Sequence, residues 1–131
     1  MTSVRSPHST RVLIVEDDRT MEALWRYIVE AAKPGADVEW ATSGEDATTQ
    51  LKQSFDLVIA DIFLGGSTTG LDLWEQNEDD EASPFILMSV ITPERLLVMA
   101  QNSSKPLPSY IQKPLDPSQC IETIRALLQG R

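Results

Sequence analysis

Charged and hydroxyl side chains stand at the ends of short apolar runs in this sequence, and together they could carry out phosphoryl chemistry. Three acidic residues follow the first run, one aspartate the third, a serine the fourth and a lysine the fifth: Glu16, Asp17, Asp18, Asp61, Ser89 and Lys113. Carboxylates gathered in one site repel one another, so they need a cation to stay ionised together. A carboxylate can also attack phosphorus in line and form an acyl phosphate when positive charge neutralises the transfer.

Each of these residues has an ordinary explanation when it is considered alone. An acidic triplet is common where a helix begins, and a single aspartate or serine after a strand is usually a turn residue. A lysine at such a place is usually a surface residue. Four such positions at the ends of four strands favour one shared site. Oxygen ligands with room left for water suit Mg²⁺ better than a softer metal.

Five apolar runs alternate with five helix-like stretches along the chain. The expected strands are Val12–Val15, Val38–Ala41, Leu57–Ala60, Phe85–Met88 and Tyr110–Gln112. The expected helices are Thr20–Ala32, a second from Ser43 to about Gln53, a third from about Leu71, a fourth from Pro93 after the cap Thr92, and a last one after Asp116 and Pro117. This order predicts an α/β fold, a doubly wound five-stranded parallel sheet with helices on both faces. Ligands of such sheets bind beyond the carboxyl ends of the strands, so the residues there decide function.

The composition is typical of one acidic globular domain. The 131 residues carry 20 acidic and 11 basic side chains, a net charge of −9 that repels phosphate backbones, so we expect no direct binding to nucleic acid. No apolar run is long enough to cross a membrane. The single cysteine, Cys120, excludes an internal disulfide and fits a cytoplasmic protein. We interpret residues 1–10, which include the one histidine, His8, as a flexible leader and residues 11–131 as the domain.

With these residues in view, the sequence resembles the receiver domains of two-component response regulators, single-domain chemotaxis-type receivers included. The resemblance extends over about residues 11–129 and rests on four segments in receiver-like order: Val12–Asp18, Asp56–Asp61, Ile86–Ser89 and Tyr110–Pro114. Each segment is weak alone, but the four together are specific. The resemblance implies the flavodoxin-like strand order 2-1-3-4-5. It also implies a signalling switch in a phosphorelay rather than an enzyme with a separate substrate.

The resemblance assigns the phosphoryl acceptor and the metal ligands. Asp61 would accept a phosphoryl group from a histidine kinase or a phosphotransfer protein, and the domain would assist its own phosphorylation and dephosphorylation. Asp17 and Asp61 would bind Mg²⁺ directly, Glu16 would help through water, and the backbone carbonyl of Phe63 would be a further ligand.

The resemblance also assigns a switch and an output surface. Ser89 and Lys113 would hold the phosphoryl oxygens, and Ser89 and Tyr110 would form the switch that moves on phosphorylation. The bond between Lys113 and Pro114 would be cis, which is otherwise uncommon. The fourth helix, fifth strand and fifth helix would form the face that binds a downstream protein.

The sequence departs from the family pattern around the acceptor and in the output region. Gly65 stands where proline is frequent, and the loop before Gly70 is one residue longer, which predicts a more mobile loop. Val90 stands where a small residue is usual. The segment before the last strand lacks the usual Gly-Ala pair, which predicts a short fourth helix. The fourth helix also contains an apolar run, residues 96–99. One face of a helix cannot bury all four of these side chains, so some should face solvent or a partner.

Two bulky side chains near the acceptor predict a long-lived phosphorylated form. By the receiver pattern, Phe63 and Ile91 flank the approach of the water that would hydrolyse the acyl phosphate. Neither side chain can hydrogen-bond or activate water. The alternative is that both point away from the acceptor and only cover the neighbouring surface. The tryptophans, Trp25, Trp40 and Trp74, we interpret as packing residues.

Other functions fit parts of the pattern. The main alternative is a receiver-like protein-interaction module that works without phosphorylation, although such modules usually lose one of the site residues. A metal-dependent hydrolase or nuclease commonly has a second acid two residues after the first, whereas Phe63 follows Asp61 at that spacing. A phosphotransfer histidine module is excluded because residues 11–131 contain no histidine. A stand-alone regulator and one domain of a longer protein both fit.

Overall fold

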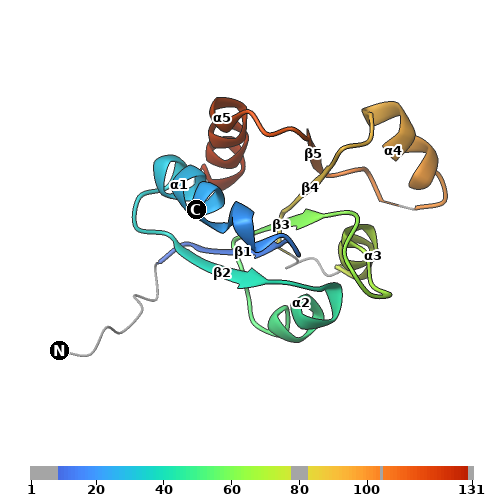
Figure 1. Ribbon diagram of the computed structural model, residues 1–131, viewed down its shortest axis with the longest axis horizontal. Coiled ribbons are helices and arrows are strands. Elements are labelled where there is room, and N and C mark those ends of the chain that lie inside the picture. The colour runs from blue at the N-terminus through green and yellow to red at the C-terminus, as the bar shows by residue number, and fades with distance from the viewer. Residues whose placement is uncertain (1–8, 78–82, 104, 130–131) are drawn as a thin grey trace.

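Strands and helices alternate along the chain in the computed structural model, which describes residues 9–77, 83–103 and 105–129 (Figure 1). The strands are β1 (Arg11–Val15), β2 (Asp37–Ala41), β3 (Leu57–Asp61), β4 (Phe85–Ser89) and β5 (Ser109–Gln112). The helices are η1 (Arg19–Met21, a 3₁₀ turn), α1 (Glu22–Ala32), α2 (Gly44–Gln50), α3 (Gly70–Gln76), α4 (Pro93–Met99) and α5 (Pro117–Leu128). Most of the expected leader, residues 1–8 with His8, lies outside the described residues.

The five strands form one parallel sheet in the order β2-β1-β3-β4-β5, which confirms the predicted fold and strand order. Ile14 of β1 lies opposite Ile59 of β3, and Ile59 lies opposite Ile86 of β4. This register brings the carboxyl ends of the central strands together at one edge of the sheet, where ligands bind in such folds.

Helices cover both faces of the sheet because successive strand residues point to opposite sides. Val12 and Ile14 pack toward α1 and α5, whereas Leu13 and Val15 pack toward α2, α3 and α4 (Figure 1). Both faces of the central strands β1, β3 and β4 are therefore buried, which explains why these strands are apolar along almost their whole length rather than alternating. Trp25 and Trp74 are buried, one in each of these two cores, which confirms their packing role.

The first and second helices differ from their expected bounds, and the fourth is short as expected. The first helix begins at Glu22, because residues 19–21 form a 3₁₀ turn instead. The second ends at Gln50 rather than near Gln53, because the amides of Lys52 and Gln53 bond only three residues back, in tight turns. The fourth helix is short, as predicted, and its connection to β5 contains no helix or strand among its described residues.

Side-chain caps set the starts of the helices that face the carboxyl edge. Ser43 accepts a hydrogen bond from the Asp46 amide at 3.0 Å at the start of α2. Thr69 and Asp72 form a reciprocal capping box at the start of α3.

Within the described part of the chain, no helix is both long and apolar enough to span a membrane.

Candidate functional site

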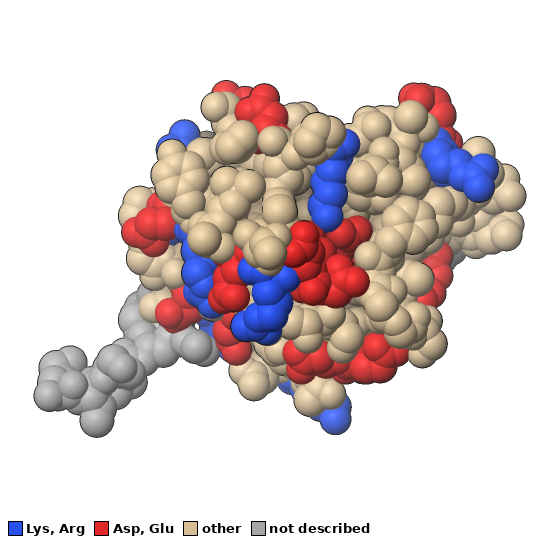
Figure 2. All heavy atoms as spheres, in the orientation of Figure 1, with Lys and Arg blue, Asp and Glu red and all other residues tan. Residues whose placement is uncertain are grey.

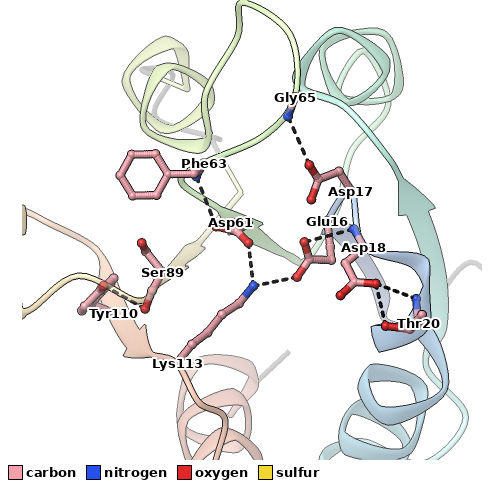
Figure 3. Close-up of polar contacts among 10 residues, drawn as sticks. All are labelled: Glu16, Asp17, Asp18, Thr20, Asp61, Phe63, Gly65, Ser89, Tyr110 and Lys113. Carbon is pink, nitrogen blue, oxygen red and sulfur yellow. Dashed lines mark hydrogen bonds and ion pairs between the residues drawn. The ribbon is translucent and has the colours of Figure 1, made fainter.

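The residues that could do chemistry gather at the carboxyl edge of the sheet (Figure 3). Asp61 is the last residue of β3 and Ser89 the last residue of β4, so each strand extends one residue further than predicted. Glu16 follows β1, and Lys113 follows β5 directly. The parallel sheet thus brings together side chains that lie up to 97 positions apart in the sequence.

Lys113 bridges two buried carboxylates. Its Nζ donates hydrogen bonds to Asp61 Oδ2 at 2.6 Å and to Glu16 Oε1 at 2.8 Å. Glu16 is only 1% exposed and Asp61 7%, so the ammonium group supplies the positive charge that lets both stay near each other.

Burial and pairing shift the pKa values in this cluster. Burial raises the pKa of Glu16, and the hydrogen bond from Lys113 offsets only part of that rise. Burial works to lower the pKa of Lys113, but the hydrogen bonds to Asp61 and Glu16 outweigh it, so the pKa is raised overall. Lys113 therefore stays charged at neutral pH, and Glu16 is the carboxyl that burial affects most clearly.

The three acidic residues after β1 point in different directions (Figure 3). Glu16 faces Lys113, whereas the exposed Asp17 accepts a hydrogen bond from the Gly65 amide at 3.2 Å. Asp18 caps η1 by accepting hydrogen bonds from the Thr20 hydroxyl at 2.6 Å and amide at 3.0 Å, and the hydroxyl bond lowers its pKa. The ordinary explanation of the triplet, a helix entry, thus holds for Asp18.

The expected metal ligands lie at the same edge but do not form a closed cluster in the described ranges. Among those residues, no three histidine, cysteine, aspartate or glutamate side chains are grouped so that they could hold a metal ion. The donor types nevertheless fit a hard cation, since Asp17, Asp61 and the Phe63 carbonyl all offer oxygen. Asp17 is exposed and is held to Gly65 by one long hydrogen bond, so its carboxylate is free to turn.

The side chains of Ser89 in β4 and Tyr110 in β5 both contact the backbone where β4 leads into the loop before α4. Ser89 is buried, and its Oγ accepts a long hydrogen bond from the Ile91 amide at 3.4 Å. The Tyr110 hydroxyl donates to the carbonyl oxygen of Ile91 at 2.6 Å and lies 3.2 Å from that of Ser89. Burial raises the pKa of Tyr110, so the phenol stays protonated. A movement of this loop would therefore reach Tyr110 directly.

The Lys113–Pro114 bond is cis, as the resemblance implies.

Acidic side chains gather near the middle of the molecular face that Figure 1 presents, with basic side chains beside them (Figure 2). A concentration of one sign of charge raises the local concentration of the opposite ion. This surface therefore favours cations over free anions.

One polar residue beside the site could not be predicted from the sequence. Glu45, in the first turn of α2, accepts hydrogen bonds from Ser67 and Thr68 in the loop between β3 and α3. The sequence around it indicated only the start of a helix. No local pattern pairs residues that lie 22 and 23 positions apart, so only the fold brings this contact to light.

Comparison with known proteins agrees with the fold. Residues 12–125 match the family model of the response regulator receiver domain. The chain therefore belongs to the response regulator receiver domain family, whose members are regulatory domains of two-component signalling.

Similar proteins include both full regulators and isolated receivers. The chain is 26% identical over 123 residues to the transcriptional regulatory protein ResD of Bacillus subtilis, covering 93% of this chain and 49% of that protein. It is 26% identical to the DNA-binding response regulator MtrA of Mycobacterium leprae, covering 91% of this chain and 51% of that protein. The chain thus spans about half the length of these curated relatives.

Among solved structures, a CheY-like receiver domain protein from Methanospirillum hungatei is 25% identical, with a TM-score of 0.75 and coverage of 92% of this chain and 94% of that one. The receiver domain of a histidine kinase from Syntrophus aciditrophicus has a TM-score of 0.77 at 24% identity, covering 93% of this chain and 92% of that one. Since the name of MtrA includes DNA binding, the expectation that this chain does not contact nucleic acid stays a prediction.

Proposed function

We propose that this domain is a phosphorylation switch that accepts a phosphoryl group on Asp61 from a histidine kinase or a phosphotransfer protein. The observation that carries the proposal is the position of Asp61 at the end of β3, beside an ammonium group, with Glu16 on the other side of that ammonium. A nucleophile next to fixed positive charge is what phosphoryl transfer to a carboxylate requires.

In the proposed reaction, a carboxylate oxygen of Asp61 attacks phosphorus in line. A new oxygen–phosphorus bond forms while the bond from phosphorus to the donor nitrogen breaks, and the donor histidine is released. Lys113 donates to the developing charge on the phosphoryl oxygens, and the Ser89 hydroxyl can donate to the bound group. Water later attacks phosphorus, the bond from phosphorus to the Asp61 oxygen breaks, and inorganic phosphate leaves as the carboxylate is restored.

Mg²⁺ is the cofactor that the oxygen donors favour. Asp17, Asp61 and the Phe63 carbonyl would hold the ion, with Glu16 contributing through water. When bound, Mg²⁺ supplies charge neutralisation to the transferred group. Few protein ligands and an exposed Asp17 indicate weak binding. Titration with Mg²⁺, followed by NMR shifts, should give an affinity that Asp17→Ala lowers; an unchanged affinity would remove Asp17 from the ligand set.

The proposed output runs through the face formed by α4, β5 and α5. Leu97 and Val98 of α4 are 60% and 53% exposed. A groove of about 450 Å³ lies on the same face, and its lining includes Pro93 of α4, Tyr110 of β5 and Gln119 of α5. Apolar side chains exposed on the face that carries a switch residue are suited to a downstream protein with a complementary apolar surface. Phosphorylation would bias the position of Tyr110 and so the affinity of this face.

The deciding experiment is intact-mass measurement after incubation with acetyl phosphate and Mg²⁺. The wild-type protein and an Asp46→Asn control should each gain one phosphoryl group, and Asp61→Asn should gain none. If Asp61→Asn is phosphorylated at the wild-type rate, the acceptor assignment is wrong. If the wild-type protein gains no mass with either acetyl phosphate or a phosphorylated histidine donor, the alternative of an interaction module without phosphorylation is favoured.

A further inference from the structure

The loop between β3 and α3, residues 62–69, starts directly after the proposed acceptor. It contains adjacent glycines, and Gly66 has a φ of +94°, which other residues rarely adopt. Such a loop should be mobile unless other residues hold it. In the structure, carboxylates from two neighbouring segments hold its backbone amides.

Glu45 makes the larger share of these contacts. Its Oε2 accepts hydrogen bonds from the Ser67 hydroxyl at 2.9 Å, the Thr68 amide at 3.1 Å and the Ser67 amide at 3.3 Å. The pKa of Glu45 is lowered, first by its own backbone amide and then by these loop contacts, so the carboxylate is ionised at neutral pH. Hydrogen bonds to an ionised acceptor are stronger than those between neutral groups.

The backbone holds Glu45 in this position. A Cβ on Gly44 would lie 2.4 Å from the Thr68 carbonyl oxygen, so the start of α2 and the loop are in direct backbone contact. The Ser43 cap fixes the first turn of the same helix. Glu45 thus reaches the loop from a fixed turn, and a residue larger than glycine before it would separate the two segments.

The second hold on the loop comes from Asp17, through the Gly65 amide at 3.2 Å. Under the proposed function, Asp17 also binds the metal ion. A carboxylate oxygen that turns toward a cation gives up its hydrogen bond to Gly65. Glu45 is outside the proposed ligand set, so its hold on the loop does not depend on the state of Asp17.

We propose that Glu45 is a positioning residue for phosphorylation of Asp61. By fixing Ser67 and Thr68, it keeps the preceding part of the loop, including the backbone of Phe63, in place beside the acceptor. The Phe63 amide donates to Asp61 Oδ1 at 3.2 Å, so the loop position and the orientation of the acceptor are linked. This inference rests on the proposed function, but the hold on the loop can be measured without any phosphorylation.

The first measurement is amide hydrogen exchange by NMR in the absence of metal. Glu45→Ala should speed exchange at Ser67 and Thr68 by about three- to tenfold, the range expected for loss of charge-assisted hydrogen bonds at an exposed site. Glu45→Gln keeps an acceptor oxygen and should lie between the wild type and Glu45→Ala. Asp46→Asn is the matched control, because it removes a neighbouring charge of the same helix turn without touching the loop, and it should match the wild type.

The second measurement is the rate of phosphorylation by acetyl phosphate at saturating Mg²⁺. The rate should fall several-fold in Glu45→Ala, recover partly in Glu45→Gln and stay unchanged in Asp46→Asn. Equal exchange rates in Glu45→Ala and the wild type, or faster exchange with an unchanged phosphorylation rate, would overturn the positioning role. A wild-type protein that is never phosphorylated would instead refute the proposed function itself, while the exchange data would still show whether Glu45 holds the loop.

Discussion

Replacing Lys113 with Met removes the ammonium group that separates two carboxylates and keeps much of the side-chain volume. Glu16 is almost fully buried, and the side chain of Lys113 is 21% exposed. Removal of one partner from a buried ion pair costs about 3 to 5 kcal/mol. Because Lys113 is partly exposed, we expect the free energy of unfolding to fall by about 2 to 4 kcal/mol at pH 8.

The loss should depend on pH because Glu16 can escape its unpaired charge by taking up a proton. In the wild type, burial already raises the pKa of Glu16 above its ordinary value of 4.5. Without Lys113 that pKa rises further, so the folded variant binds a proton that the unfolded chain has released. The stability of the variant therefore falls as the pH rises from about 4.5 through the raised pKa. Lys113 itself titrates above its ordinary value of 10.5 and does not change charge in this window.

Urea denaturation at pH 5 and pH 8 measures this directly. We expect a loss of about 1 to 2 kcal/mol at pH 5, roughly half of that at pH 8, since the protonated carboxyl no longer carries a buried charge. The double variant Glu16→Gln with Lys113→Met should recover part of the loss at pH 8, because it leaves one fewer charge without a partner. The same loss at both pH values, or a double variant less stable than Lys113→Met, would refute this account of the cluster.

Three further predictions test other parts of the molecule. Replacing Phe63 with Asn and Ile91 with Glu should speed decay of the phosphorylated form about tenfold in excess Mg²⁺, because polar side chains can guide water; an unchanged decay measured by intact mass would refute the long-lived form. Burial raises the pKa of Cys120 to about 11 from an ordinary 9.0, so the native thiol should react with a thiol reagent at pH 8 about 100-fold more slowly than the thiol in urea. Since the unfolded thiol ionises first, this group also lowers stability as the pH rises from about 9 to about 11, a slope that Cys120→Ser should lack. Leu97→Glu on α4 should weaken binding of the downstream partner about tenfold with phosphorylation unchanged, whereas Tyr27→Glu on α1 should affect that binding little.

The fold followed from the sequence because its signals are local and repeated. The central strands β1, β3 and β4 are apolar runs that are buried on both faces, and the turns between elements carry polar or glycine residues, so the number of strands and the sheet type could be predicted. The strand order came from the resemblance to receiver domains. The ends of elements were less certain. Asp61 and Ser89 were placed just after their strands, whereas each one pairs as the last residue of its strand, since backbone pairing ignores the change from apolar to polar side chains.

The site residues could be predicted as a group, but their individual contacts could not. The topology requires that the ends of β1, β3, β4 and β5 meet, which places Glu16, Asp61 and Lys113 at one edge. Which way a carboxylate turns depends on amides and hydroxyls that lie nearby only after folding. Asp18 therefore caps η1, and Glu45, which no motif marks, holds a loop that is distant in sequence.

The two oxygens of Asp61 have different partners, and this division explains how one modification could reach two segments. Oδ2 accepts from the Lys113 ammonium at the start of the β5–α5 connection, and Oδ1 accepts from the Phe63 amide in the loop before α3. A phosphoryl group bonded to either oxygen displaces one of these donors or recruits it to a phosphoryl oxygen. The first outcome releases a segment, and the second pulls it toward phosphorus. Because Glu45, which is outside the proposed ligand set, holds the loop from the other side, we expect the loop to stay in place and the β5 side, with Tyr110 beside it, to carry the larger movement.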